Sequence, residues 1–134
     1  VLHLHGEATK VRPEDGEYDR TYSEKEVIDI GYDEVHLGDK APNGSQLRPH
    51  IVFFGEAVPN IEKAIDIVSA ADIMLIVGTS LNVYPAAGLY RYAPNGIPIY
   101  LIDPEDVAIA DPRITQIRQV ATKGMETFRR MLGQ

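Results

Sequence analysis

The stretch DIMLIVGTSLNVYPAAG, residues 72–88, decides the fold of this chain. Its first half is a continuous apolar run rich in branched residues, which is typical of a buried β-strand. The run ends in Gly78, Thr79 and Ser80, and Pro85 follows where the first turn of a helix tolerates proline. The stretch therefore predicts a buried strand, a short polar loop and a helix that extends to Ala93.

The same alternation continues on both sides of this stretch. Upstream, HIVFF at residues 50–54 predicts a short buried strand, and Asn60 can cap a helix whose apolar residues recur at helical spacing. Downstream, we expect strands at 99–103 and 117–121 and a closing amphipathic helix at 123–132. The pattern predicts an α/β fold in which residues 48–134 form part of a Rossmann-like parallel sheet with crossover helices.

Residues 1–47 have a different texture, polar and rich in turn residues. Strand-like pieces at 2–5, 9–12, 27–30 and 35–37 predict a small, irregular β-rich lobe with one core strand at its start. The chain opens on alternating apolar residues, Leu2 and Leu4, without an initiator methionine. We therefore expect that a further segment of the protein precedes it.

Composition excludes several classes of function. The net charge of -7 argues against direct binding to nucleic acid or to an anionic membrane. No apolar run reaches the roughly 20 residues that span a bilayer, so a cytoplasmic protein is expected. Cysteine is absent, which leaves no disulfide, no thiolate zinc site and no cysteine nucleophile in this chain.

Small and polar residues follow three of the predicted strands, as FGE at 54–56, GTS at 78–80 and DPE at 103–105. Ligands of open parallel sheets bind beyond the carboxyl ends of the strands. Gly78 allows close backbone approach, and hydroxyls or a carboxylate suit ribose and phosphate recognition. A nucleotide-like ligand is one interpretation. Ordinary turn formation is the other, because GxGxxG and GxxxxGK[ST] are both missing.

The segments LRPHIVFFGEAVP at 47–59 and ADIMLIVGTSLNVYPAAGL at 71–89 closely resemble the C-terminal half of the sirtuins, the NAD-dependent protein lysine deacylases, of the bacterial type. HG at 5–6, IYLID at 99–103 and the closing ATKGMETFRRML fit the same family. The resemblance is strong over residues 45–103 and weaker elsewhere. It implies an enzyme that uses NAD as co-substrate and transfers the acyl group from acyl-lysine to ADP-ribose, releasing nicotinamide.

The resemblance also implies two sets of site residues. The set expected to bind NAD comprises Gly78, Thr79, Ser80, Asp103, Ala121 and Thr122. Asp103 stands where the family usually has asparagine, so an amide is replaced by a carboxylate that only accepts when ionised. The set expected to bind an acyl-lysine peptide or protein comprises Val52, Phe54, Gly55, Glu56, Asn82 and Val83. Backbone groups of this set would pair with the peptide as an added strand, and its apolar side chains would surround the lysine stem.

Two departures from the family limit what this chain carries. Many sirtuins bind zinc through four cysteines in the small lobe, whereas here Pro13 stands near the first position and His36 is alone. We therefore expect no zinc, and we interpret His3 and His5 as structural.

The second departure is the family's general-base histidine, which is expected upstream of this chain. No catalytic residue is assigned within it, and the N-terminal half of the same protein is an expected partner. Alone, the chain should be inactive. Two alternatives are a non-catalytic module that binds NAD or ADP-ribose, and a sirtuin-like NAD hydrolase.

Overall fold

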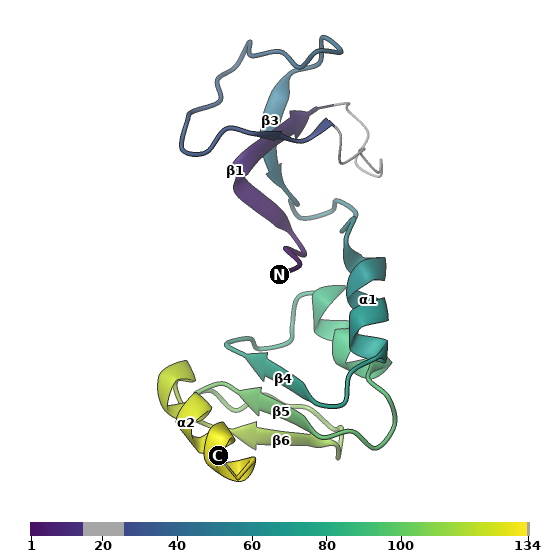
Figure 1. The fold of residues 1–134 in the computed structure, drawn as a ribbon, viewed down its shortest axis with the longest axis vertical. Helices are drawn as coiled ribbons and strands as arrows, with labels where there is room; N and C mark the ends of the chain where they lie inside the picture. Colours follow the sequence, from purple (N-terminus) through teal and green to yellow (C-terminus); the bar gives the residue numbers. More distant parts are fainter. Residues whose placement is uncertain (15–25, 134) are drawn as a thin grey trace. The chain divides into compact units, whose positions relative to one another are not determined.

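The computed structural model describes residues 1–14 and 26–133, in two compact units, Val1–Asn60 and Ile61–Gln134 (Figure 1). Residues 15–25 of the predicted small lobe lie outside the described residues. The first unit contains β1 (Gly6–Pro13), β2 (Ile28–Asp29) and β3 (Leu47–Ile51). The second contains α1 (Ile61–Ser69), β4 (Met74–Val77), η2 (Ala86–Tyr92), β5 (Ile99–Ile102), β6 (Ile114–Ile117) and α2 (Ala121–Met131). Within the described ranges, no helix has the length and apolar character needed to cross a membrane.

The first unit is built on an antiparallel sheet with the strand order β2-β1-β3. The ladder between β1 and β3 is irregular between Gly6 and Val11. Gly6 has a φ of 87°, and a side chain there would collide with the backbone carbonyl oxygen of His50. A glycine is therefore required where β1 begins to pair with β3.

The predicted strand at 50–54 is wrong in its position and in its partner. The observed strand is β3, which pairs antiparallel with β1 and does not join the parallel sheet. Its buried residues are Arg48 and His50, whereas Phe53 and Phe54 are exposed beyond its end. The apolar residues indicate a buried strand, but the buried side chains of β3 are Arg48, which pairs with Glu56, and His50. Hydropathy cannot indicate this arrangement.

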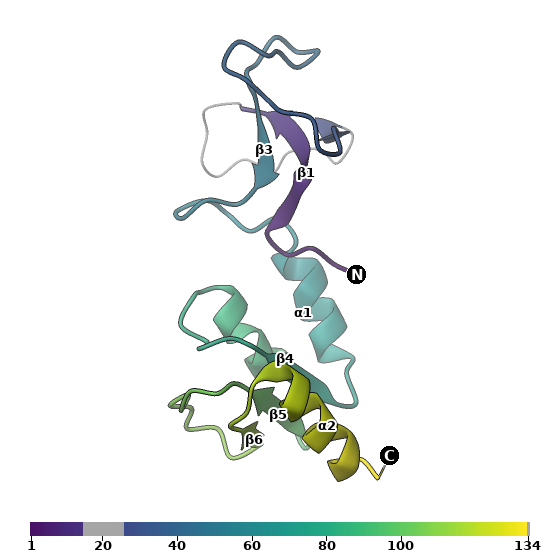
Figure 2. The same ribbon diagram turned by 90° about the vertical axis from the view of Figure 1, so that its left-hand side faces the viewer.

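The second unit confirms the α/β class. Its strands β4, β5 and β6 are parallel and stand in chain order. In β5, Ile99 and Leu101 pack into one apolar cluster, to which α1, η2 and the loop after β5 contribute. The alternate residue Ile102 packs into a second cluster with Phe128 of α2. The period of two thus gives the sheet two covered faces, with α2 lying along one of them (Figures 1 and 2).

Helix α2 lies close to the sheet because Gly124 has no side chain. A Cβ atom at this position would collide with Cγ2 of Ile102. Gly124 and Phe128 are both buried on the face of α2 that contacts β5 and β6. The contact requires glycine although glycine weakens a helix by about 1 kcal/mol relative to alanine.

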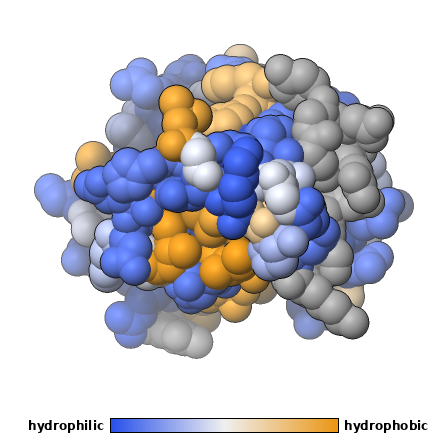
Figure 3. Space-filling view, turned by 90° about the horizontal axis from the view of Figure 1, so that it is seen from above, coloured by the Kyte–Doolittle hydropathy of each residue, from blue (hydrophilic) through white to orange (hydrophobic). Residues whose placement is uncertain are grey.

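Several predicted elements differ from those observed. The segment after Pro85 forms a 3-10 helix, since it is short, contains Gly88 and stops before Pro94. The last strand is Ile114–Ile117, earlier than the predicted 117–121, because it pairs in register with β5. Residues 2–5 and 35–37 form no strands. The face in Figure 3 is mostly hydrophilic with separate hydrophobic groups, which is ordinary for a folded protein.

Candidate functional site

The carboxyl ends of the three parallel strands meet at one edge of the second unit. Val77, Ile102 and Ile117 are register partners across the sheet. The Gly78 amide donates to Ile102 O at 2.9 Å, and the Asp103 amide donates to Ile117 O at 3.3 Å. Helix α2 then begins shortly after β6. Residues 78–80, Asp103 and the first turn of α2, all predicted to bind NAD, therefore lie at the same edge.

The loop after β4 is tightly curved and is held by contacts of Thr79 and Leu81. Gly78 has a φ of 67° with open space beside its Cα, so the backbone is accessible there. Leu81 also has a positive φ, 55°, which is uncommon for a residue with a side chain. Its amide donates to Thr79 Oγ1 at 3.1 Å, and its side chain packs against the apolar cluster of β4 and β5. The hydroxyl of Thr79 thus shapes the loop, a role that was not predicted.

Asp103 is held in place by the turn that follows β5. Asp103 is only 9% exposed, and its Oδ1 accepts a hydrogen bond from the Glu105 amide at 2.9 Å. A carboxylate fixed in this way at the end of a parallel strand can accept hydrogen bonds from a ribose.

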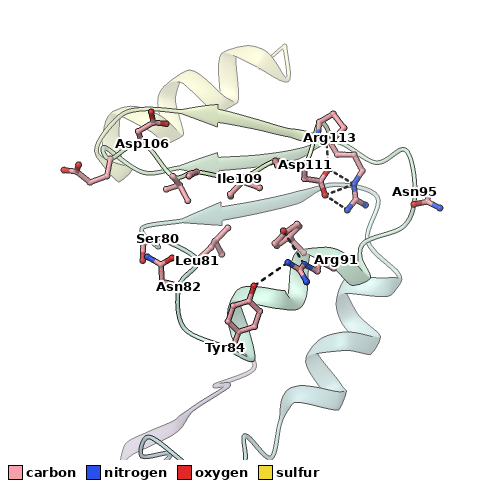
Figure 4. A pocket seen from close by; sticks show the side chains of 16 residues that line it. Ser80, Leu81, Asn82, Tyr84, Arg91, Asn95, Asp106, Ile109, Asp111 and Arg113 are labelled. Atoms are coloured by element: carbon pink, nitrogen blue, oxygen red, sulfur yellow. Dashed lines mark hydrogen bonds and ion pairs between the residues drawn. The ribbon is translucent and has the colours of Figure 1, made fainter.

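A pocket of about 1010 Å³ opens beside this edge (Figure 4). Ser80 and Asn82, one from each predicted set, lie on its wall in the loop after β4. The other walls come from η2 and from the loop between β5 and β6. The predicted residues Ser80 and Asn82 therefore border one open cavity. The other predicted residues of this unit do not line it, namely Gly78, Thr79, Val83, Asp103, Ala121 and Thr122.

Charged and aromatic side chains that were not predicted also line the pocket. Arg91 Nη2 donates to the Tyr84 hydroxyl at 3.5 Å. Arg113 holds Asp111 through contacts that include Nη2 to Oδ2 at 2.8 Å, and it donates to Ala93 O at 3.1 Å. Hydrogen bonds from Arg113 lower the pKa of Asp111, so this carboxyl stays ionised. Tyr84 is the first residue of the YPAAG motif and Arg91 follows shortly after its end, so this motif was the signal that marked the wall.

The remaining predicted peptide-binding residues lie in the first unit, apart from Val83, which is exposed in the loop before η2. Val52 is half-buried directly after β3. Phe54 is 94% exposed and Gly55 has open space beside its Cα, so both face outward from the turn at 53–56. The predicted role of Phe54 as a wall is compatible with this exposure. Phe54 is therefore not packed in a core, whereas Val52 is half-buried.

Glu56 differs from its neighbours, since its side chain is only 6% exposed and is held by arginines. Arg48 donates to both carboxylate oxygens, at 2.5 and 3.2 Å, and Arg12 lies 3.6 Å away. Burial alone would raise the pKa of Glu56, but hydrogen bonds from Arg48 and from the Phe53 amide outweigh it and hold the pKa below its usual value. Sequence reasoning missed both arginines.

The histidines form no metal centre in the described part of the chain. His3 lies near Glu7, and exposed His36 lies 3.3 Å from Glu34 and 3.7 Å from Asp39. Within residues 1–14 and 26–133, no three His, Asp or Glu side chains form a group that could hold a metal ion. The absence of zinc from the protein stays a prediction.

Known proteins are similar to this chain over the same motifs. The model of the Sir2 family matches residues 1–85. An NAD-dependent protein deacylase of Bacteroides thetaiotaomicron is 51% identical over 133 residues, which is 98% of this chain and 56% of that protein. The chain thus spans about half the length of the curated relatives it matches.

Solved structures agree with the sequence matches. A Sir2 homologue mutant in complex with ADP-ribose superposes with a TM-score of 0.73 at 27% identity, covering 98% of this chain and 53% of the other. A Sir2 complex with a p53 peptide and NAD+ superposes with a TM-score of 0.62 at 26% identity, covering 97% of this chain and 53% of the other.

Proposed function

Because the chain belongs to the Sir2 family, we propose that its protein is an NAD-dependent protein lysine deacylase. The reaction transfers the acyl group of acyl-lysine to ADP-ribose and releases nicotinamide. The convergence of three parallel strand ends carries the proposal, because it brings the predicted NAD set to one edge in a chain that is 51% identical to a deacylase.

On the NAD side, each predicted residue has a distinct role. The backbone at Gly78 is open to close approach by the dinucleotide, and Ser80 supplies a hydroxyl on the adjoining pocket wall. Asp103 accepts from ribose hydroxyls through its carboxylate. Backbone groups of Ala121 and Thr122 contact the adenine. These residues fit a ribose well, while the carboxylate of Asp103 disfavours a nearby phosphate.

On the peptide side, the proposal assigns mainly backbone roles. Gly55, Glu56 and Asn82 pair with an extended acyl-lysine peptide as an added strand. Val52, Phe54 and Val83 contact the aliphatic stem of the lysine, whose methylenes must leave water. The exposure of Phe54 and Val83 supports this assignment, since exposed apolar side chains are available to a partner.

The reaction needs a general base for a ribose hydroxyl, after the acyl oxygen has attacked the carbon that loses nicotinamide. We assign none of the four histidines of this chain to that role. His50 is buried in the first unit, and burial together with Arg12 and Lys10 lowers its pKa. His3 and His36 lie beside the carboxylates of Glu7 and Glu34.

The test is an assay of the protein expressed from its complete coding sequence, with NAD and an acetyl-lysine peptide. Mass spectrometry should detect free lysine peptide, nicotinamide and O-acetyl-ADP-ribose in equal amounts. Nicotinamide without deacylated peptide would instead indicate an NAD hydrolase. Binding of ADP-ribose without turnover would indicate a non-catalytic module, and either result contradicts the proposal.

Asp103 offers a sharper test of the NAD set. Asp103→Asn keeps an acceptor for the Glu105 amide and removes the charge, so ADP-ribose should bind more tightly. Asp103→Ala should bind it more weakly. Asp72→Asn is the matched control, because it removes the same charge from an exposed residue before the amino end of β4. Equal effects at Asp103 and Asp72 would count against the assigned role.

Two further predictions belong to this proposal, a cytoplasmic location and the absence of structural zinc. The lack of cysteine in the chain and its sirtuin-like small lobe motivate the second. Elemental analysis of the purified protein should find well under one zinc per molecule. Stoichiometric zinc would contradict it.

A further inference from the structure

The turn at residues 53–56 has two sides with opposite character. The Glu56 amide donates to Phe53 O at 3.1 Å and Gly55 has a φ of 89°, which together define a type II turn. Phe54 and Gly55 form its outer side, where Phe54 is exposed and Gly55 faces open space. The outer side is therefore available to a partner.

The inner side is tied to the sheet through one carboxylate. Glu56 Oε2 accepts from the Phe53 amide at 2.9 Å, which closes the turn a second time. The guanidinium of Arg48, on β3, grips both oxygens of Glu56 and lies 4.5 Å from the centre of the Phe53 ring. Arg48 thus contacts both ends of the turn from a position within a strand.

The placement of a second arginine shows how closely the carboxylate is tied to the strands. Arg12 on β1 and Arg48 on β3 are direct cross-strand partners, and both are buried. Like charges directly opposite each other destabilise a sheet unless an anion offsets them. Glu56 supplies that anion, with Glu14 adding a contact to Arg48 at 3.1 Å. Moving Glu56 away would remove the carboxylate that both guanidinium groups share, which favours the closed turn.

We propose that Arg48 is a positioning residue for the acyl-lysine peptide. It holds the turn at 53–56 in the shape in which the outer backbone pairs with an extended peptide. The inference rests on the proposed function, since it needs that pairing. Arg48 itself touches no substrate, because its guanidinium is buried against Glu56 on the inner side. Its loss should therefore weaken peptide binding and leave NAD binding, which is assigned to the other unit, unchanged.

The test compares KM values in the protein expressed from its complete coding sequence. Arg48→Lys keeps the charge but loses the pair of hydrogen bonds to the two carboxylate oxygens of Glu56. The KM for an acetyl-lysine peptide should therefore rise about tenfold. The KM for NAD and kcat at saturating peptide should stay within about twofold, well inside that change. Arg130→Lys is the matched control, because Arg130 is an exposed arginine near the end of α2 whose hydrogen bonds go to Glu126 O and Thr127 Oγ1, outside both predicted sets. It should not raise the KM for peptide.

Hydrogen exchange gives a readout that does not depend on activity. In Arg48→Lys, the Phe53 and Glu56 amides should exchange faster, while amides paired between β1 and β3 keep their rates. A purely structural role would speed exchange through the whole first unit and would raise both KM values, which overturns the inference. An unchanged peptide KM in an active protein overturns the inference alone. A wild-type protein that does not deacylate the peptide overturns the proposed function and this inference together.

Discussion

The two compact units of this chain bury different kinds of groups. In the described part of the first unit, Arg12, Arg48 and His50 are buried beside few buried apolar residues, which are Val11, Ala41 and Val58. In the second unit, the buried set is almost wholly apolar, with Asp103 as its charged member. The comparison indicates that the stability of the first unit depends on paired charges and therefore on pH. The stability of the second unit depends on apolar packing.

The largest effect should come from breaking the packed unit. Leu101→Ala removes a fully buried side chain from the centre of β5 and should lower the free energy of unfolding of the second unit by about 3 kcal/mol. Urea titration followed by hydrogen exchange of the β5 amides measures this. Ile67→Ala, at an exposed position of α1, is the control and should change the free energy of unfolding by under about 0.5 kcal/mol. Equal losses would mean that the second unit lacks a packed core.

A smaller effect should follow from breaking the charged unit. Glu56→Gln removes the carboxylate that Arg12 and Arg48 share and leaves Arg48 its contact with Glu14, which should destabilise the first unit by about 2 kcal/mol. Hydrogen exchange of β1 and β3 amides reports it. Asp106→Asn breaks an exposed pair with Arg118 and should cost under about 1 kcal/mol. If both substitutions cost the same, the first unit does not depend on its buried charges.

The next smaller loss of stability should come from a substitution in the contact between α2 and the sheet. Alanine favours a helix over glycine by about 1 kcal/mol, yet Gly124→Ala should destabilise the second unit by about 1 kcal/mol because its methyl group collides with Ile102. Thermal unfolding measures the change. The double variant with Ile102→Ala should lose less than the sum of the two single losses. Stabilisation by Gly124→Ala alone would show that the helix is not held by this contact.

The smallest effect should be a difference between the two units in how their stability changes with pH. His50 and Glu56 both have lowered pKa values in the folded protein, His50 by burial and Glu56 by Arg48 despite its burial. A lowered pKa contributes stability that is complete above the unfolded-state value and is lost as the pH falls toward the folded-state value. The first unit should therefore weaken as the pH falls below about 6.5, through His50, and again below about 4.3, through Glu56.

Hydrogen exchange between pH 7.5 and about 3 checks this prediction. The second unit should hold its stability down to about pH 3.9, because its Asp111, whose pKa is also lowered by Arg113, responds only below that value. His50→Gln should flatten the step that begins near 6.5 and leave the step near 4.3 in place. Parallel pH profiles for the two units would contradict the division of roles.

Much of the site could be predicted from the sequence because its motifs are local. Gly78, Thr79 and Ser80 follow an apolar run directly, and Asp103 ends the next one, so their convergence at one sheet edge follows from parallel pairing. The arginines of the first unit could not be predicted in this way. Arg12 and Arg48 are far apart in the chain, and charged residues are usually exposed, so neither pattern nor composition marks them as buried partners of Glu56.

By itself, the sequence determined the family, the α/β class and the order of strand, loop and helix in residues 61–133, because those features are written in local periodicity and in contiguous motifs. The tertiary structure alone decided that β3 pairs with β1, that Phe54 is exposed, that Gly124 contacts Ile102 and that Glu56 is shared by two arginines. Each of these depends on which distant segment becomes the neighbour. Strand pairing and the pairing of buried charges are settled by such long-range contacts, and no local pattern encodes them.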